Sequence, residues 1–237
     1  EYTRHTLFRN FLDPYTWHRQ NCNARCDILN VARFCYAHKE EGSLNWVKNE
    51  KNRPIFKLDR LAPANNIEHA NAHDALADVR ATIGIAKIIK KTQPKLFDYA
   101  LSLNDKKEVG KLVKPLHPML LTSSSFGYKS SFTRLVTAIC NHPEYNDRAI
   151  VFNLNQDPEI FLELETEELK TLTFSRKSDL PKGIEKIDLS ELVYNKSPMF
   201  VCSPNSDNFK ISPILIDKFQ LNLEKCLKNL RFIQQNR

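Results

Sequence analysis

The stretch IEHANAHDALADVRATIGIAKIIKK, residues 67–91, predicts a long helix. Its apolar residues recur at helical spacing on one stripe, formed by Leu76, Val79, Ile83 and Ala86. Its last turns are basic, which suits the negative end of a helix dipole. His73 and the acids Asp74 and Asp78 stand at the start, where Asp74 favours a first turn. We therefore predict a helix that begins near Asp74, with His73 in the turn before it.

His73 and Asp78 are five residues apart, and an ideal helix rotates by about 140° over that step. The two side chains converge only if His73 precedes the helix and overhangs its first turn. A carboxylate and an imidazole at a helix N-terminus suit metal-assisted chemistry on a phosphate. The carboxylate would hold a divalent cation, and the histidine would take a proton from water. Spacing alone also allows a solvent-facing Asp78 and a loop histidine without a shared role.

The composition predicts a globular chain of one large or two modest domains. The sequence has 237 residues, is 41% hydrophobic and contains only 5 glycines, so it can bury a sizeable core. It has no run of 18 apolar residues to span a membrane and does not open like a signal peptide. The 6 scattered cysteines indicate a reducing, cytoplasmic location. The C-x3-C of Cys22 and Cys26 has no second pair at zinc-finger spacing, which favours free thiols.

The net charge is +7 and is concentrated in the first part of the chain. Residues 1–93 contain 15 Lys and Arg against 10 Asp and Glu, whereas residues 94–237 contain 20 against 18. A basic surface attracts phosphate through counterion release, although many ordinary soluble proteins are equally basic. Charge therefore favours a nucleic-acid partner without establishing one.

The first ninety residues read as helices separated by polar turns. Helices are predicted over 7–12, stopping before Asp13-Pro14, and from Asp27, where Ile28, Val31, Ala32 and Cys35 form an apolar stripe. Residues 38–54 read as a polar loop, and residues 56–67 as a short extended piece with one or two helical turns. Gln93-Pro94 marks a domain boundary.

The second part reads as a small β-rich domain. A helix is predicted over 96–113, followed by strands over 117–126, 133–140, 148–155 and 197–204. A final helix over 214–233 has one apolar stripe, formed by Ile216, Phe219, Leu223, Cys226, Leu227 and Leu230. The fold class is therefore α+β.

Residues 68–87, EHANAHDALADVRATIGIAK, closely resemble the H-x4-D motif of the DEDD-type 3′ to 5′ exonucleases, in the variant with a histidine in the last motif. Further segments resemble bacterial exodeoxyribonuclease I, in that family's order: FRNFLDPYTW (8–17), DILNVARFCYAH (27–38), FKLDRLAPANNIEHANAHDALADV (56–79), QPKLFDYAL (93–101) and HPE (142–144). The resemblance covers essentially the whole chain and is strongest up to about residue 105.

The resemblance implies part of a ribonuclease H-like exonuclease domain over 1–93 and an SH3-like domain over 94–237, with a groove for single-stranded DNA between them. Asp78 would bind metal and His73 would be the general base. Lys57 stands where the family usually has an arginine near the substrate phosphate, so it keeps the charge but loses a two-point contact. Further strand contacts would come from Arg4, Tyr15, Arg19, Arg33, Lys106, Phe174 and Asn195. For Arg4, Tyr15, Arg19 and Arg33 the alternative is an ordinary solvated or core-edge side chain.

The family pattern requires four acidic ligands for two metal ions, and only Asp78 is found here. A D-x-E pair and a third acid belong to segments that precede Glu1 in the family, and the family's C-terminal helical region is also absent. The resemblance thus implies that the chain is a piece of a longer protein. Asp157-x-Glu159 is a poor substitute because Pro158 suits a turn and the pair follows His73 instead of preceding it.

The resemblance therefore implies part of an exonuclease that degrades single-stranded DNA in repair and recombination, with Mg²⁺ or Mn²⁺ as the cofactor. The expected partners are single-stranded DNA and single-stranded DNA-binding protein, and the complete protein is expected to be a monomer. Residues 1–237 alone are expected to be inactive. The alternative is a non-catalytic module that binds single strands. A helix-rich structural protein is disfavoured because it leaves the pairing of His73 with Asp78 unexplained.

Overall fold

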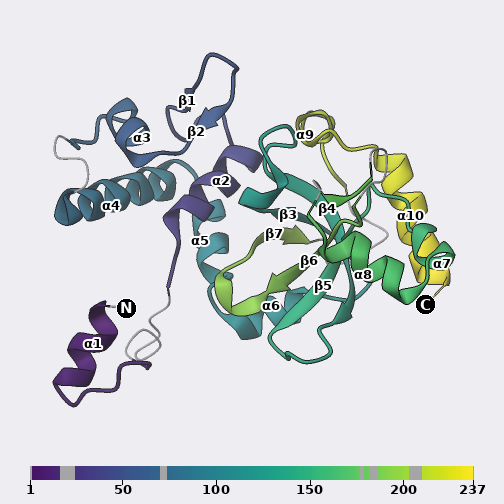
Figure 1. Ribbon diagram of the computed structural model, residues 1–237. Helices are drawn as coiled ribbons and strands as arrows, with labels where there is room; N and C mark the ends of the chain where they lie inside the picture. The colour runs from purple at the N-terminus through teal and green to yellow at the C-terminus, as the bar shows by residue number, and fades with distance from the viewer. Residues whose placement is uncertain are drawn as a thin grey trace.

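The structure is a computed structural model, and it describes residues 2–16, 25–69, 74–176, 179–181, 186–202 and 210–236. Helices dominate the first part of the chain, and a five-stranded antiparallel sheet dominates the second (Figure 1). Among the helices of these ranges, none is long and apolar enough to cross a membrane.

The first part of the chain contains helix α1 and a group of three further helices, α2 to α4, packed with a two-stranded hairpin. Asp27 accepts a hydrogen bond from the backbone of Leu29 at 2.9 Å, and Asp74 accepts one from Ala77 at 3.0 Å, so each acid caps the helix that follows it. The elements are α1 (Tyr2–Arg9), α2 (Ile28–His38), β1 (Val47–Lys48), β2 (Pro54–Ile55), α3 (Leu58–Ala64) and α4 (Ala75–Thr92).

The second part is built on one sheet with the strand order β6-β5-β4-β3-β7, every neighbouring pair antiparallel. Its strands are β3 (Pro118–Thr122), β4 (Thr133–Asn141), β5 (Arg148–Asn153), β6 (Leu189–Val193) and β7 (Met199–Cys202). Its helices are α5 (Pro94–Ser102), α6 (Lys106–Leu112), η2 (Ser124–Phe126), α7 (Ile160–Glu163), α8 (Thr166–Phe174), η4 (Tyr194–Lys196), α9 (Pro213–Phe219) and α10 (Leu223–Gln235).

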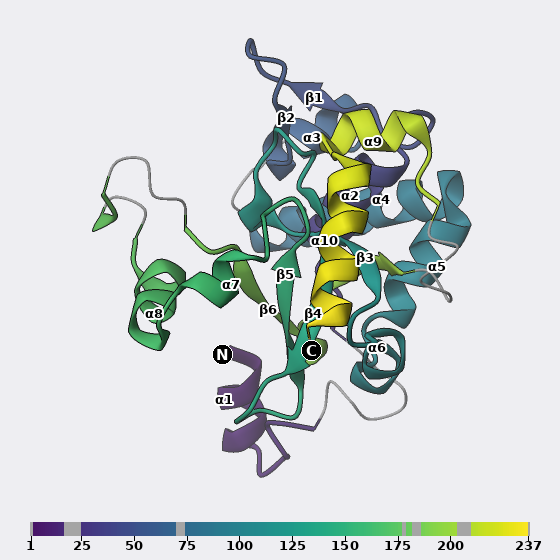
Figure 2. The same cartoon turned by 90° about the vertical axis from the view of Figure 1, so that its right-hand side faces the viewer.

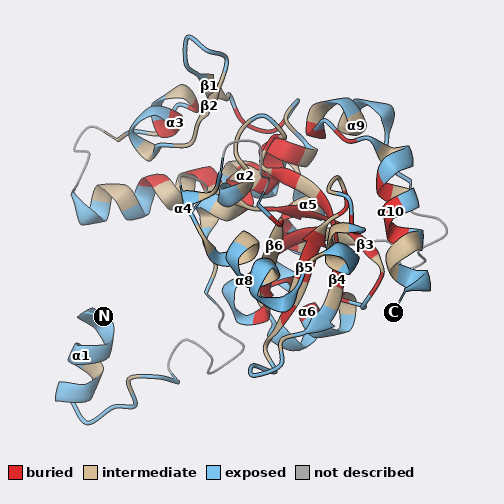
Figure 3. Cartoon of the chain, turned by 45° about the vertical axis from the view of Figure 1, so that its right-hand side comes forward, coloured by how far each residue is buried: buried red, intermediate tan, exposed pale blue. Residues whose placement is uncertain are grey.

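Helices cover both faces of the sheet. On one face α2 and α5 contribute Val31, Cys35 and Phe97 to a core shared with Met119 and Phe200. On the other face α9 and α10 bury Phe219, Cys226 and Leu230 against Leu120, Leu135 and Phe152. Figure 2 shows α10 running along this second face, and Figure 3 shows the buried residues concentrated in the sheet and in α2. One core thus contains residues from both sides of Gln93, while the division into two domains stays a prediction.

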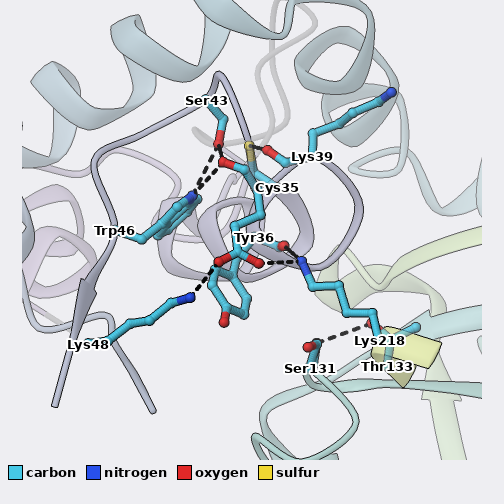
Figure 4. A network of polar contacts seen from close by, with 10 residues as sticks. Cys35, Tyr36, Lys39, Ser43, Trp46, Lys48, Ser131, Thr133 and Lys218 are labelled. Carbon is cyan, nitrogen blue, oxygen red and sulfur yellow. Dashed lines mark hydrogen bonds and ion pairs between the residues drawn. The ribbon is translucent and has the colours of Figure 1, made fainter. Parts of the chain in front are cut away.

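A cluster of polar contacts ties α9 to the first part of the chain (Figure 4). The ammonium of Lys218 donates to the backbone carbonyl of Tyr36 at 2.6 Å and to Glu40 at 2.7 Å, and it lies 4.6 Å from the centre of the Tyr36 ring. The other carboxylate oxygen of Glu40 pairs with Lys48 at 2.8 Å. Glu40 therefore links α9, the end of α2 and strand β1.

The predicted strands are confirmed, because β3, β4, β5 and β7 each overlap one of the four predicted ranges. Several predicted helices differ in extent. Asp105 caps α6 by accepting from Lys107 at 2.7 Å, so residues 96–113 form two helices instead of one. Gln220 is left-handed, with φ 54°, and splits the final helix into α9 and α10. The predicted loop 38–54 contains the β1–β2 hairpin, and β6, α7 and α8 were not predicted.

The predicted apolar stripe of α4 is not the buried one. Leu76, Val79 and Ile83 are 56%, 54% and 48% exposed, whereas the buried residues of this helix are Ala81, Ile85 and Ile89. The helix is apolar on two faces, and the face of Ile85 meets α2, α3 and α5. The first helix differs as well: α1 ends at Arg9, Phe11 has φ 58°, and Phe8 and Phe11 are exposed.

Candidate nucleic-acid and metal site

The turn from α3 to α4 brings residues 67–69 alongside the start of α4. Asn66 is left-handed with φ 57°, and the amide of Ile67 donates to the carbonyl of Ala62 at 3.0 Å, which closes the end of α3. Ile67 then packs over Gly84, where an added Cβ would lie 2.9 Å from Cδ1 of Ile67. The missing side chain of Gly84 therefore lets this segment lie close to α4.

Asp78 lies in the first turn of α4, where the helix dipole favours a negative charge. Its Oδ1 is 2.7 Å from Nε2 of His69. The Asp78 side chain is 44% exposed, whereas that of His69 is 2% exposed. An accessible carboxylate at this position fits an oxygen ligand of a divalent cation. His73, the predicted base, lies outside the described residues, so its role stays a prediction.

The described residues contain no group of three or more His, Cys, Asp or Glu side chains that could hold a metal ion. Asp78 therefore fits one position of a metal site and does not complete one. Asp157 and Glu159 do not supply the rest, because Asp157 accepts from the backbone of Glu159 at 3.0 Å in an exposed turn before α7. This geometry agrees with the turn expected at Pro158.

A groove of about 940 Å³ lies between the helical first part and η4. Two of the predicted contacts, Lys57 and Asn195, line it. Thr82 also lines the groove, and its hydroxyl donates to the backbone carbonyl of Asp78 at 2.8 Å, so the groove reaches α4 one turn after Asp78. The groove therefore joins both halves of the chain next to the candidate metal ligand.

Three cationic residues line this groove, namely Arg25, Lys57 and Lys196, against one acid, Asp27. Asn195 is held by a hydrogen bond from its amide to Asp147 at 2.8 Å. A second hollow of about 400 Å³ shares three lining residues with the groove and extends along the hydroxyl-rich segment Ser123–Ser125. Cationic and hydroxyl donors along a continuous groove suit a phosphate backbone.

Arg33 lies on α2 beside the groove. Its guanidinium donates to Asn30 at 2.9 Å and lies 5.7 Å from the centre of the Phe56 ring, and both of these partners line the groove. Partial burial lowers the pKa of the Arg33 guanidinium from its usual value. The contact fixes the side chain at the edge of the groove, and its predicted role in binding DNA stays a prediction.

Arg4 and Tyr15 contact each other, with the guanidinium 5.3 Å from the ring centre. Asp13 accepts from the backbone of Tyr15 at 2.7 Å, which fixes the turn after α1, and Tyr15 is 65% exposed. Figures 1 and 3 show α1 apart from the helices that line the groove. The structure therefore does not bring these two residues to the groove, and Arg19 lies outside the described residues.

Lys106 and Phe174 do not line the groove either. Lys106 is exposed in the first turn of α6, a helix that packs against η4. Phe174 is 81% exposed at the end of α8, which lies away from α3 and α4 in both Figure 1 and Figure 2. Their predicted contacts with DNA are not tested by this geometry.

Sequence reasoning missed Arg25, Lys196 and His69. Lys196 directly follows the predicted Asn195, so that neighbourhood was a usable signal. Arg25 lies two residues before the cap of α2, and an arginine there has no distinguishing pattern. The contact of His69 with Asp78 depends on the turn after α3, which no helical period reveals.

The chain is similar to known proteins over nearly its whole length. Residues 104–237 match the family model described as the exonuclease I SH3-like domain. The chain is 37% identical to exodeoxyribonuclease I of Escherichia coli K12 over 238 residues, covering 100% of this chain and 49% of the relative. It is 36% identical to exodeoxyribonuclease I of Haemophilus influenzae, covering 97% of this chain and 48% of the relative. The chain thus spans about half the length of these curated relatives.

Solved structures of E. coli exonuclease I have the same fold over this region. The complex with a dA16 oligonucleotide matches with a TM-score of 0.88 at 36% identity, covering 98% of this chain and 49% of that one. The ExoI/SSB-Ct complex matches with a TM-score of 0.84 at 35% identity, covering 99% and 49%. A zinc-bound ExoI–ssDNA complex matches with a TM-score of 0.86 at 36% identity, with the same coverage.

Proposed function

The chain belongs to the exonuclease I family, and we propose that it forms part of a 3′ to 5′ exonuclease that degrades single-stranded DNA to 5′-mononucleotides. The observation that carries this proposal is the cationic groove that reaches α4 one turn from Asp78. A groove lined by three cations can hold a strand by its phosphates, and its end lies beside the one carboxylate that the family motif assigns to metal.

Each residue of the proposed site has a distinct role. Asp78 provides one oxygen ligand, and His73 accepts the proton from the attacking water. Lys57, Arg25 and Lys196 neutralise phosphates, while Asn195, fixed by Asp147, offers a neutral polar contact. Lys57 binds as a point charge because an ammonium has no planar fork. Arg33 at the groove edge, Arg4, Arg19, Tyr15, Lys106 and Phe174 remain proposed contacts along a longer strand.

We propose Mg²⁺ as the cofactor, with Mn²⁺ as a substitute, because Asp78 offers the hard oxygen that both ions prefer. When bound, such a cation supplies an activated water and neutralises charge on the phosphate. Asp78 alone cannot hold two cations that prefer several oxygen ligands each. Residues 1–237 by themselves are therefore proposed to be inactive, and a carboxylate set from additional chain is required.

The cellular setting belongs to the same proposal. The complete protein would act as a monomer in the cytoplasm, in DNA repair and recombination. Its partners would be single-stranded DNA and single-stranded DNA-binding protein, which accords with the names of the relatives' complexes. The second candidate function is single-strand binding without catalysis, and the groove without a complete set of metal ligands in the described residues favours it for residues 1–237 alone.

One experiment separates the two candidates. Residues 1–237, a chimera in which they replace the matching half of the E. coli relative, and the Asp78→Asn form of the chimera are incubated with 3′-ended single strands and magnesium. We expect mononucleotide release from the chimera alone, because the other half restores the acidic ligands. Salt-sensitive binding without cleavage is expected for residues 1–237. Full activity of the Asp78→Asn chimera would refute the metal assignment, and an inactive chimera that binds DNA would favour the non-catalytic module.

A further inference from the structure

The stretch before α4 contains a second histidine, His69, which the H-x4-D motif does not use. Nε2 of His69 lies 2.7 Å from Oδ1 of Asp78, although nine residues separate them in sequence. The imidazole is 2% exposed and the carboxylate 44% exposed. The buried imidazole of His69 therefore contacts a carboxylate that is accessible to solvent.

The position of His69 depends on the turn that precedes it in the chain. Asn66 turns the chain in the left-handed conformation, and the Ile67 amide is bonded to Ala62 at 3.0 Å. Ile67 fills the space over Gly84 and packs against the core shared by the two parts of the chain. The turn at Asn66 and the packing of Ile67 thus help to place His69.

The hydrogen-bonding partners define the state of the ring. An ionised carboxylate only accepts, so Nε2 of His69 must carry the proton that is donated to Asp78. Nδ1 is buried and has no partner among the described residues. Nε2 is therefore the donor nitrogen in the contact with Asp78.

We propose that His69 is a positioning residue for Asp78. Its Nε2–H holds the carboxylate at the start of α4 in the orientation in which it binds a divalent cation. The inference rests on the proposed function through the role of Asp78 as a metal ligand. The N–H donor of the buried ring favours the rotamer of Asp78 in which its Oδ1 faces His69.

The ring also has a role distinct from that of His73. A proton acceptor for water must reach the substrate, whereas His69 is enclosed and donates to Asp78. Groups that support a metal ligand typically change metal affinity by about 10- to 100-fold when they are removed. Loss of His69 should therefore weaken cation binding without removing the ligand itself.

The test uses the chimera with the matching half of the E. coli relative, which supplies the other acidic ligands, and Mn²⁺ alone, observed by NMR as paramagnetic broadening of the backbone signals of Ala77 and Val79. The unmodified chimera should show saturable broadening at the start of α4, which Asp78→Asn strongly weakens. His69→Leu keeps an apolar side chain but lacks the donor, and it should raise the Mn²⁺ concentration for half-maximal broadening by about tenfold or more. His69→Gln retains an N–H donor at a similar reach and should restore most of the affinity.

Two further variants guard against a merely structural effect. His142→Leu is the matched control, because His142 is 14% exposed and faces Glu191 at 3.5 Å, away from α4. It should leave the broadening unchanged. Gly84→Ala should weaken Mn²⁺ binding although the His69 ring is unchanged. The new methyl group displaces Ile67, and the His69 side chain moves with it.

The outcomes separate this inference from the proposed function. If the unmodified chimera shows no broadening at α4, Asp78 is not a cation ligand and both proposals lose their metal site. If broadening occurs and His69→Leu binds Mn²⁺ like the unmodified chimera, only the positioning role is refuted. Equal losses in His69→Gln and His69→Leu would also refute it, since the donor would then not matter. A long-range ¹⁵N spectrum that shows Nε2 of His69 without a proton would contradict the assigned donor.

Discussion

His69 and His38 both have buried ring nitrogens, but they differ in their hydrogen-bonding partners. His69 is enclosed but has a carboxylate partner at 2.7 Å. His38 lies between the rings of Phe34 and Phe219, at centroid distances of 4.7 and 5.4 Å, and its Nε2 is buried without a partner in the described part of the chain. Desolvation, aided by the charges of Lys218 and Lys39, lowers the pKa of His38 to about 4.

This pKa makes stability depend on pH between about 6.5 and 4. The unfolded chain takes up a proton below pH 6.5 while folded His38 stays neutral, so the unfolded state binds more protons in that window. The free energy of unfolding therefore falls as pH falls, by about 3 kcal/mol over the full window. His38→Leu should remove most of this slope in urea unfolding measured from pH 7 to 4. The exposed control His5→Leu should keep it, and an unchanged slope in His38→Leu would contradict the pKa shift.

Burial also makes the cysteine thiols differ in reactivity. Burial raises the pKa of Cys35 and of Cys226 to about 11, whereas Cys140 is exposed. Only a thiolate reacts readily, so iodoacetamide at pH 8 should modify Cys140 well before Cys35 or Cys226. Peptide mass spectrometry over time gives the order. Early modification of Cys35 in the folded chain would show that its burial is transient.

At the scale of elements, Lys218 joins α9 to the end of α2. The side chains of Lys218 and Glu40 are 18% and 27% exposed, so their pair is partly shielded from solvent. Lys218→Met retains the stem but removes the donor to both Tyr36 and Glu40. Hydrogen bonds to charged groups are worth about 1.5 to 3 kcal/mol, and we expect a loss of that order in the free energy of unfolding.

The matched control for this pair is Lys111→Met. Lys111 and Glu108 form an i,i+3 pair on α6 with 71% and 48% exposed side chains, and solvent screening leaves such exposed pairs with little effect on stability. Urea unfolding of both variants at pH 7 measures the difference. Equal losses would mean that the contact between α9 and α2 adds nothing beyond a surface ion pair.

Elements with strong local signals could be predicted from sequence, and those that depend on tertiary context could not. Capping acids such as Asp27 and Asp74 mark helix starts, and β-branched runs mark four of the five strands of the sheet. Strand β6 contains Ser190 and Glu191 and lies at the sheet edge, so its pattern is weak. Gln220 splits the last helix without the glycine that usually signals such a break.

The candidate site was predictable to the same extent. Asp78 and Lys57 follow from motif and resemblance, and Lys57 and Asn195 line the same groove, while their roles in binding stay predictions. The contact between His69 and Asp78 was not predictable, because it requires the left-handed Asn66 and the close approach over Gly84. Sequence periodicity describes residues within a helix, and this contact is made from outside it.

At the scale of the whole molecule, the apolar stripes of α2 and α4 differ in how far they are buried. Val31 and Cys35 of α2 are fully buried, and α2 packs against strands β3 and β7, so the predicted apolar stripe of this helix has a packing surface within the chain. Leu76, Val79 and Ile83 of α4 are about half exposed, and Figure 3 shows exposed and intermediate residues along this helix. These three residues therefore leave an exposed apolar stripe on α4.

An exposed apolar face of this kind promotes association in water, so residues 1–237 should self-associate through α4. Replacing Val79 and Ile83 together by lysine should lower the apparent mass in sedimentation velocity, because two charges would have to be desolvated in the contact. The free energy of unfolding should change by less than about 0.5 kcal/mol, as is usual for surface substitutions. Ile214→Lys is the matched control: Ile214 is 78% exposed on α9, outside this face, and its replacement should leave association unchanged. Association that persists in the double variant but disappears with Ile214→Lys would place the contact on α9 instead of α4.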